Sequence, residues 1–117
     1  MIERVTSGIS RTVFLVGRYA IKVPCCRYGW PYFLRGLLAN LQERTWGRGG
    51  SPKLCPVLWA DRFGLFVVMR RAEILAEPPT PMRFHQFTFG ESIPPIECKA
   101  DSFGVLDGRL VAVDYGN

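Results

Sequence analysis

The stretch Tyr19-Ala20-Ile21-Lys22-Val23 decides the fold of this sequence. It follows a β-rich run at residues 12–16 and a two-residue turn, Gly17-Arg18, so the sequence predicts a β-hairpin. Because side chains alternate along a strand, Ala20 and Lys22 share one face and the bulkier Tyr19, Ile21 and Val23 share the other. We therefore expect Lys22 to lie beside a small residue and to point inward.

The composition fits a single globular domain. The chain has 117 residues, of which 48% are hydrophobic and 21% charged; this excludes a disordered tail, a collagen-like repeat and a disulfide-dense miniprotein. The formal net charge is +5, and all basic residues except Lys22, Lys53 and Lys99 are arginines. Arginine suits bidentate pairing with phosphate or carboxylate, so the charge is compatible with many acidic partners.

Neither a secretory signal nor a membrane span is visible in the sequence. The longest purely apolar run, residues 65–69, is far shorter than the roughly 20 residues that cross a bilayer. The four cysteines include the adjacent pair Cys25 and Cys26 but no C-x-x-C motif, and His85 is the only histidine. A structural zinc site needs paired soft ligands. We therefore expect a cytoplasmic protein with reduced thiols and a buried Cys55.

Residues 30–48 carry the clearest helical signal. Apolar side chains recur three and four residues apart along this stretch: Phe33, Leu34, Leu37, Leu38 and Leu41. Pro31 suits a first helical turn, and a glycine-rich stretch that starts at residue 47 ends the helix. Glu43 falls near the C-terminal end, where the helix dipole disfavours an acid, so a specific partner for Glu43 is an alternative to a solvated side chain.

The remaining segments predict more strands and a final hairpin. Residues 55–60 and 65–70 are strand candidates, and Asp107-Gly108 between two apolar runs predicts a C-terminal β-hairpin. The predicted fold class is α+β: an antiparallel sheet of about five strands with one main helix packed on it, plus this hairpin. We expect one domain over residues 1–117. It divides into a sheet-and-helix part (1–75), an ordered proline-rich connector (76–95) and a hairpin part (96–117).

In this order the elements resemble a protein-kinase-like fold in a minimal form. Residues 19–22 resemble the V-A-I-K strand, whose lysine holds nucleotide phosphates and pairs with an acid on the next helix, here Glu43. Residues 67–73 resemble the last strand and hinge over which an adenine ring lies. Residues 114–116, Asp-Tyr-Gly, resemble the D-F-G motif, whose aspartate binds Mg²⁺. Residues 97–104 match the spacing of the catalytic loop, with Glu97 in place of its aspartate and Ser102 in place of its asparagine.

The sequence departs from this family pattern at several positions. The glycine-rich loop, which lets backbone N–H groups approach phosphates, is reduced to Gly8. Glu97 is one methylene longer than an aspartate. Ser102 is a poorer Mg²⁺ ligand than an amide oxygen, although Asp101 beside it can substitute. The sequence also reaches Asn117 directly after Asp-Tyr-Gly, without an activation segment. These departures favour a degenerate, pseudokinase-like protein.

The resemblance implies two functions, of which the first is a non-catalytic binding or inhibitory module. It is similar to small phage-encoded kinase-like proteins that act on a host protein or defence complex in the host cytoplasm. The interface would use aromatic and arginine side chains beside the helix, which dominate binding hot spots: Trp30, Tyr32, Arg35 and Trp46. The alternative is that these aromatic residues simply flank the helix core.

The second function is a minimal phosphotransferase that binds ATP and Mg²⁺. Its residues would form three sets: Lys22, Glu43 and Gly8 for the nucleotide, Asp114 and Ser102 for Mg²⁺, and Glu97 or Asp101 as the base. A nucleic-acid partner is disfavoured because the sequence has no basic run and no RNP-like aromatic motif. We expect Phe84, Phe87 and Phe89 either to cap the apolar surface under the connector or to lie in a homodimer contact.

Overall fold

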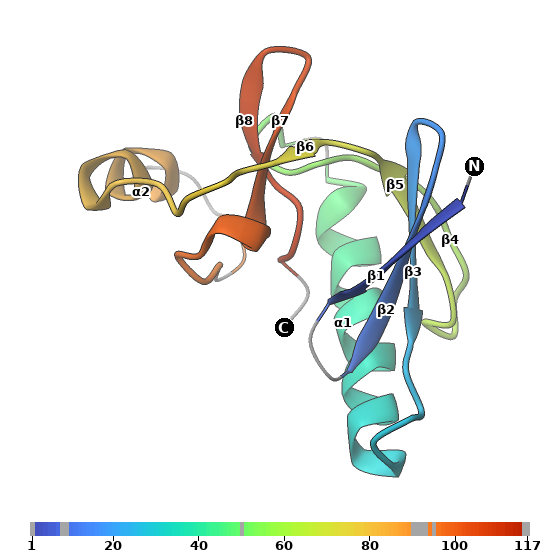
Figure 1. Ribbon diagram of the computed structural model, residues 1–117. Helices are drawn as coiled ribbons and strands as arrows, with labels where there is room; N and C mark the ends of the chain where they lie inside the picture. Colours follow the sequence, from blue (N-terminus) through green and yellow to red (C-terminus); the bar gives the residue numbers. More distant parts are fainter. Residues whose placement is uncertain (1, 8–9, 50, 90–93, 95, 116–117) are drawn as a thin grey trace.

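Within the residues that the structure describes, two antiparallel sheets and two α-helices make up the fold (Figure 1). The computed structural model of the protein describes residues 2–7, 10–49, 51–89, 94 and 96–115. The strands are β1 (Ile2–Ser7), β2 (Arg11–Val16), β3 (Tyr19–Pro24), β4 (Val57–Ala60), β5 (Val67–Arg70), β6 (Glu73–Ile74), β7 (Phe103–Leu106) and β8 (Arg109–Ala112). The helices are α1 (Trp30–Gly47) and α2 (Pro81–Thr88), with one 3-10 turn, η1 (Ala100–Ser102). The predicted α+β class is confirmed.

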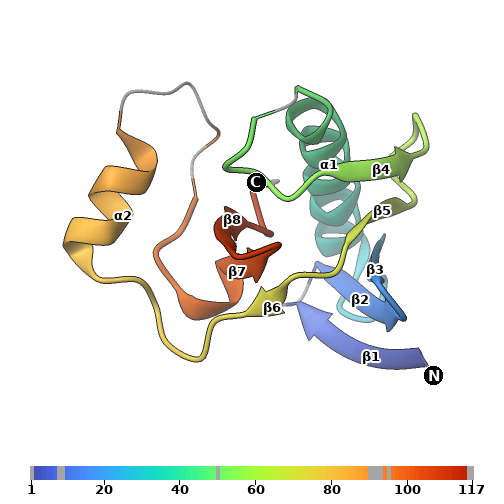
Figure 2. The same ribbon diagram turned by 90° about the horizontal axis from the view of Figure 1, so that it is seen from above.

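The larger sheet has the strand order β1-β2-β3-β5-β4, and the smaller one has the order β6-β7-β8. Helix α1 lies across one face of the larger sheet, where it contacts β3, β4 and β5 (Figures 1 and 2). The smaller sheet stands beside the C-terminal end of α1, and α2 lies beyond it. The sequence did not predict β1, β6 or α2. The described helices include none that is long and apolar enough to cross a bilayer.

The β2–β3 hairpin is formed as predicted. Its strands are joined by Gly17-Arg18, and Gly17 has a φ of +58°, which glycine adopts at little cost. Val13 lies opposite Lys22 across the hairpin. Ala20 and Lys22 are buried whereas Tyr19 is exposed. The lysine therefore points inward, as the alternation of side chains along the strand predicted.

Helix α1 is confirmed almost to the residue, but a different face of it is buried. The residues of its buried face are small or polar: Gly36, Ala39, Asn40 and Glu43. A methyl group at Gly36 would lie 2.3 Å from the carbonyl oxygen of Ser10, so the helix backbone approaches the sheet more closely than a larger residue allows. Leu34 and Leu38, expected to strengthen the apolar face, are 41% and 59% exposed. The small face packs inward because it brings Asn40 and Glu43 to the charged residues of the sheet.

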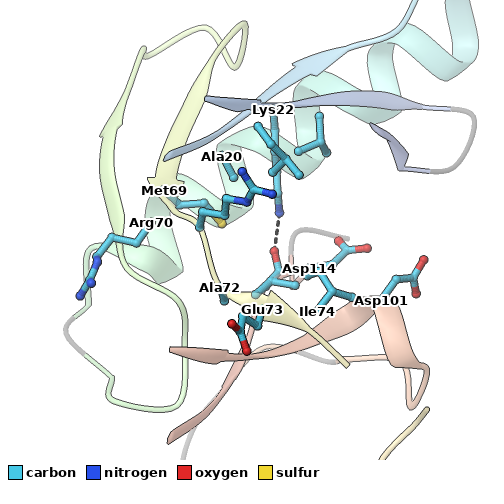
Figure 3. Close-up of a pocket in the computed structure, with 13 residues that line it drawn as sticks. Ala20, Lys22, Met69, Arg70, Ala72, Glu73, Ile74, Asp101 and Asp114 are labelled. Atoms are coloured by element: carbon cyan, nitrogen blue, oxygen red, sulfur yellow. Dashed lines mark hydrogen bonds between the residues drawn. The ribbon is translucent and has the colours of Figure 1, made fainter. Parts of the chain in front are cut away.

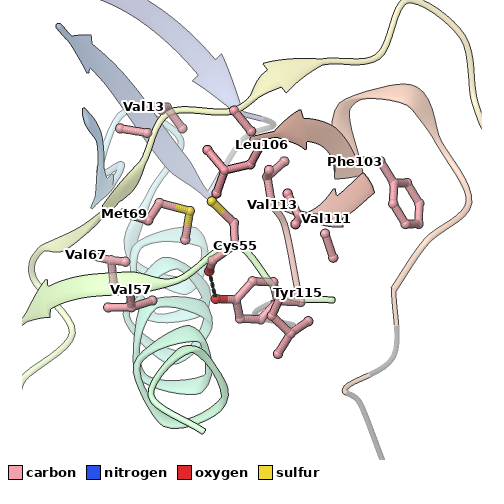
Figure 4. Close-up of a cluster of buried hydrophobic side chains, with 14 of the residues drawn as sticks. Val13, Cys55, Val57, Val67, Met69, Phe103, Leu106, Val111, Val113 and Tyr115 are labelled. Carbon is pink, nitrogen blue, oxygen red and sulfur yellow. Dashed lines mark hydrogen bonds between the residues drawn. The ribbon is translucent and has the colours of Figure 1, made fainter. Parts of the chain in front are cut away.

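The hydrophobic core joins the two sheets (Figure 4). It takes residues from β2, β4 and β5 on one side and from β7 and β8 on the other: Val13, Val57, Val67, Met69, Phe103, Leu106 and Val111. Tyr115 completes it, since its ring is buried and its hydroxyl donates to the carbonyl oxygen of Cys55 at 2.7 Å. Cys55 is buried, as predicted, and the four cysteines are free thiols. Burial raises the pKa of the Cys55 thiol to about 11.

The described part of the proline-rich connector contains α2, which begins at a proline that suits a first helical turn. The rings of Phe84 and Phe87 pack edge-on against Phe103, with ring centroids 6.0 Å and 5.4 Å away. Phe89 is 71% exposed. Of the two roles predicted for these rings, capping of the apolar surface therefore holds for Phe84 and Phe87 and is wrong for Phe89.

Candidate functional site

A cavity of about 610 Å³ lies between the larger sheet and the segment that carries β6, η1 and the end of the chain (Figure 3). This volume is within the range of small-molecule sites. Its walls are mostly apolar, and the side chains come from β2, β3, β5 and β6: Val13, Leu15, Ala20, Met69 and Ile74. Six charged residues also line it: Lys22, Arg70, Arg71, Glu73, Asp101 and Asp114. We call this cavity the cleft.

The predicted ion pair between Lys22 and Glu43 is present. The ammonium nitrogen of Lys22 lies 3.0 Å from both carboxylate oxygens of Glu43. It also donates to the carbonyl oxygen of Val113, the residue before Asp114 (Figure 3). A lysine ammonium has three N–H donors, and these three acceptors match that number. Lys22 is only 5% exposed, so it borders the cleft with its hydrogen bonds directed into the protein.

Arg11, at the start of β2, joins this pair to Asp114. Its guanidinium forms two parallel bonds to the Glu43 carboxylate, at 2.8 Å and 3.1 Å. The same group donates to Asp114 Oδ1 at 2.8 Å and to Asn40 Oδ1 at 3.1 Å. Arg11 is 3% exposed. Lys22 and Asp114 are thus brought to one site, but an arginine and a glutamate lie between them.

The position of Arg11 on the inward face follows from the register of the β2–β3 hairpin. In an antiparallel hairpin, directly opposed residues project to the same face. Val13 is opposite Lys22, and residues two apart share a face, so Arg11 lies on the same face as Lys22. The turn at Gly17-Arg18 fixes this register from sequence alone. A buried arginine on the inward face of a hairpin needs an acid as its partner, and Glu43 is the acid of the helix that packs on this hairpin.

Glu43 is the centre of the charge network. It is 0% exposed, and its carboxylate also accepts the backbone N–H of Tyr115 at 3.2 Å. Burial alone would raise its pKa, but the charges of Lys22 and Arg11 outweigh burial and hold the pKa of Glu43 at about 2. Two cations and two carboxylates, with Asp114 as the fourth member, therefore balance one another in formal charge.

The residues assigned to the catalytic loop are only partly brought together. Asp101 is exposed and lines the cleft. Glu97 is also exposed, but its carboxylate pairs with Lys99 at 3.2 Å and is not among the residues that line the cleft. Ser102 is 1% exposed, and its carbonyl oxygen accepts the N–H groups of Val113 and Asp114 at 2.9 Å and 3.4 Å. Its observed role is to hold the chain that carries Asp114.

The metal assignment fits the described residues poorly. Their histidine, cysteine, aspartate and glutamate side chains include no group of three that could hold a metal ion. The carboxylate of Asp114 is engaged by the Arg11 guanidinium, which puts a positive group at the atom assigned to Mg²⁺. Gly8 lies outside the described residues, so its predicted contact with phosphates is not placed.

The predicted interface residues do not form one exposed patch. Trp30 is 67% exposed and stacks on Phe33 at a centroid distance of 5.4 Å. Tyr32 is half-buried and lies under the guanidinium of Arg35, 5.8 Å from the ring centre. Trp46 is also half-buried, and it packs against the hydrophobic core. Of these three rings, that of Trp30 is exposed, whereas those of Tyr32 and Trp46 are half-buried.

Comparison with known proteins does not assign this chain to a family. No protein-family model matches the sequence, and a search of curated proteins gives no match.

Proposed function

We propose that this chain is a degenerate, minimal kinase-like domain that works as a non-catalytic binding module. The contact between Arg11 and Asp114 carries the proposal. The kinase resemblance assigns Asp114 to Mg²⁺, and phosphoryl transfer depends on that cation to neutralise the charge developing on the phosphates. Here the side chain of Arg11 supplies the positive charge at the same carboxylate, and it does so from within the fold.

The charge balance supports the same conclusion. Arg11 and Lys22 already neutralise Glu43 and Asp114, so a divalent cation at Asp114 would stand beside two buried positive groups. Its binding would require the guanidinium to leave a contact shorter than 3 Å. Arg11 would then remain buried without Asp114 as a partner. The loss of a partner is unfavourable for a buried charge.

The contacts of Lys22 also support the proposal of a non-catalytic binding module. The lysine of the resembled motif holds nucleotide phosphates while it pairs with the helix acid. In this structure Lys22 has the acid, Glu43, and in addition the carbonyl oxygen of Val113. A phosphate oxygen would have to replace one of these acceptors. Lys22 therefore connects the larger sheet to α1 and to the end of the chain through hydrogen bonds.

A phosphotransferase with Mg-ATP is the second candidate, because one observation favours it. Lys22, Asp101 and Asp114 all border the same cleft, in the positions that the resemblance assigns to phosphate, base and metal. Ala20 and Met69 form an apolar side of the cleft, which is the kind of surface that an adenine ring would require (Figure 3). If this candidate is correct, Arg11 must move aside when Mg-ATP binds.

Thermal unfolding with nucleotide separates the two candidates. The midpoint should be the same, within a degree, for the protein alone and with millimolar Mg-ATP. A rise of several degrees with Mg-ATP, absent with ATP and EDTA and lost in Asp114→Asn, would contradict the binding-module proposal and support the transferase. Transfer of phosphate to water or to a generic protein substrate should be undetectable in the same samples. Inhibition of a host enzyme or defence complex stays a prediction of the resemblance.

A further inference from the structure

One side of α1 presents a row of exposed apolar side chains. Trp30, Leu34 and Leu38 are spaced four residues apart, so they lie one above the other on the helix surface. They are 67%, 41% and 59% exposed. Leu34 and Leu38 come from the pattern that predicted the helix, and the burial of the opposite, small face leaves all three residues at the surface. We call this row the α1 flank.

The turn between β4 and β5 extends the α1 flank. Its Gly64 packs directly on the helix, since a methyl group there would lie 2.5 Å from the carbonyl oxygen of Leu37. Asn40 fixes the turn by donating to the carbonyl oxygen of Gly64 at 2.9 Å. The residues on either side of the glycine, Phe63 and Leu65, are 65% and 42% exposed. Helix α1 and the β4–β5 turn, which pack on each other, therefore both expose apolar side chains to solvent.

Most of the side-chain charges around the flank are positive. Glu43 is the only acid in α1, and it is buried. The carboxylate of Asp61, in the β4–β5 turn, is occupied by the backbone N–H groups of Phe63 and Phe66 at 3.1 Å and 2.7 Å. The arginines of the helix and the turn are not so occupied: Arg35, Arg44, Arg48 and Arg62 form no ion pair with an acid in the described part of the chain.

The order of these groups along the helix matters. Arg44 and Arg48 follow Leu41 by three and seven residues, which places them on the same side of the helix, at its C-terminal end. Arg62 lies beside Phe63, with its guanidinium 5.4 Å from the ring centre. Positive charges therefore border the apolar row at the C-terminal end of the helix, at Arg44 and Arg48, and in the neighbouring turn, at Arg62. Exposed apolar rows with such a border are typical of protein-binding sites.

We propose that the α1 flank binds an acidic amphipathic helix of a partner protein. The apolar side of that helix would pack along Trp30, Leu34 and Leu38, and its glutamates or aspartates would pair with Arg48 and Arg62. This inference rests on the proposed function, because it names the chemistry of the partner that a binding module of this kind requires. The match of an apolar row to a helix follows a recurrent recognition mode.

Two other occupants fit the charges less well. A second copy of this chain carries the same net charge of +5, so a contact between two copies would bring two positively charged proteins together. A nucleic acid would meet the arginines but would leave Leu34 and Leu38 without a matching surface, since bases stack on aromatic rings and not on leucines. Both occupants become outcomes of the test.

The test uses two labelled peptides of about 18 residues, the length of a five-turn helix. Both carry leucines at helical spacing; one has glutamates at the remaining positions and the other has lysines. Fluorescence anisotropy with the full chain should show binding of the glutamate peptide, weakened by added salt, and at least ten-fold weaker binding of the lysine peptide. Equal binding of the two peptides, or binding of neither, would overturn the proposal.

Three variants locate the binding. Leu38→Asp should abolish binding of the glutamate peptide, whereas Met82→Asp, at a 72% exposed position on α2, should leave it unchanged. The double variant Arg48→Glu and Arg62→Glu should reverse the preference toward the lysine peptide, which a merely misfolded protein would not do. Equal effects of Leu38→Asp and Met82→Asp would overturn the proposal. So would a dimer in light scattering that Leu38→Asp makes monomeric, or a single-stranded oligonucleotide that competes with the peptide.

The outcomes of this test and of the nucleotide test are independent. A rise in the unfolding midpoint with Mg-ATP would contradict the proposed function while leaving the peptide preference of the α1 flank to be measured. Loss of the peptide preference would overturn the flank proposal without giving the cleft any affinity for Mg-ATP.

Discussion

Arg11 Nη2 lies 2.8 Å from Asp114 Oδ1, and the two residues are separated by 103 positions in the chain. This contact connects the start of the β2–β3 hairpin to the segment that follows the last strand. With the Arg11–Glu43 and Lys22–Glu43 pairs, it makes a continuous network that connects the larger sheet, α1 and the segment after β8. The network therefore contributes to stability and occupies the charged end of the cleft at the same time.

Arg11→Gln should destabilise the protein by about 3–5 kcal/mol, because it breaks a buried ion pair with Glu43 and removes the cation that contacts Asp114. Arg70→Gln is the matched control: it removes an exposed arginine–aspartate pair, and exposed pairs contribute about 1 kcal/mol or less. Urea unfolding of the three proteins measures both effects. Similar losses for Arg11→Gln and Arg70→Gln would show that the buried network contributes no more than a surface contact.

The same variant should change the response to divalent cations. With the guanidinium gone, Asp114 and Glu43 lose their arginine partner, and millimolar Mg²⁺ or Mn²⁺ should raise the unfolding midpoint of Arg11→Gln and not that of the parent protein. Arg11→Lys keeps a positive charge and should resemble the parent. An equal rise in all three proteins would mean that Arg11 does not compete with metal at this site.

The free energy of unfolding should decrease as the pH is lowered through the range in which Glu43 takes up a proton. Its pKa is about 2 in the fold against an ordinary value of 4.5. A carboxyl group with a lowered pKa binds fewer protons in the folded state than in the unfolded state. Its contribution is therefore complete above about pH 4.5 and is lost as the pH falls from there toward 2. Urea unfolding between pH 7 and pH 2 measures this, and Glu43→Gln should give a flatter profile. An unchanged slope in Glu43→Gln would assign the acid sensitivity to other groups.

Gly36→Ala should destabilise the protein although alanine favours a helix. A methyl group there would meet Ser10 O at 2.3 Å and the Cα of Pro24 at 2.9 Å, and backbone atoms do not move aside cheaply. Forced overpacking of this kind costs about 1–3 kcal/mol. Gln42→Ala, at an exposed position of the same helix, should be neutral or slightly stabilising. A gain in stability for Gly36→Ala would contradict the close approach of α1 to the sheet.

The cysteines should differ in reactivity. Cys26 and Cys98 are exposed, whereas Cys55 is buried and its pKa is raised to about 11. Iodoacetamide at pH 8 followed by mass spectrometry should therefore label Cys26 and Cys98 within minutes and leave Cys55 unlabelled until urea is added. Rapid labelling of Cys55 in the native protein would mean that the core around Tyr115 opens readily.

Local signals in the sequence predicted most of the fold. The β2–β3 hairpin, α1 and the final hairpin each follow from spacing and turn residues within a short window, and the Lys22–Glu43 pair follows from the resemblance. The buried face of α1 could not be predicted in this way. Periodicity indicated the leucine side, but packing was decided by Gly36 and by partners that lie far away in the sequence.

The missing members of the site have a similar cause. Arg11 gains its role only when β2, α1 and the chain end meet, so its partners are 29, 32 and 103 positions away. Helix α2 was missed because prolines dominate the local composition, although one of them occupies a helix start that favours proline. Glu97 was assigned from spacing alone, and spacing does not tell whether a side chain turns toward the cleft or toward a neighbouring lysine.

Tyr115 is held at both of its ends, by its backbone N–H on Glu43 and by its hydroxyl on Cys55. Together with the bond from Arg11 to Asp114, this anchors the last strand segment to the opposite half of the molecule. The larger sheet with α1 and the smaller sheet are therefore not free to close around a ligand by a hinge motion. A ligand of the cleft should associate in a single kinetic step, with a rate set by diffusion and by the movement of a few side chains, and without the slow closing phase that hinged domains show.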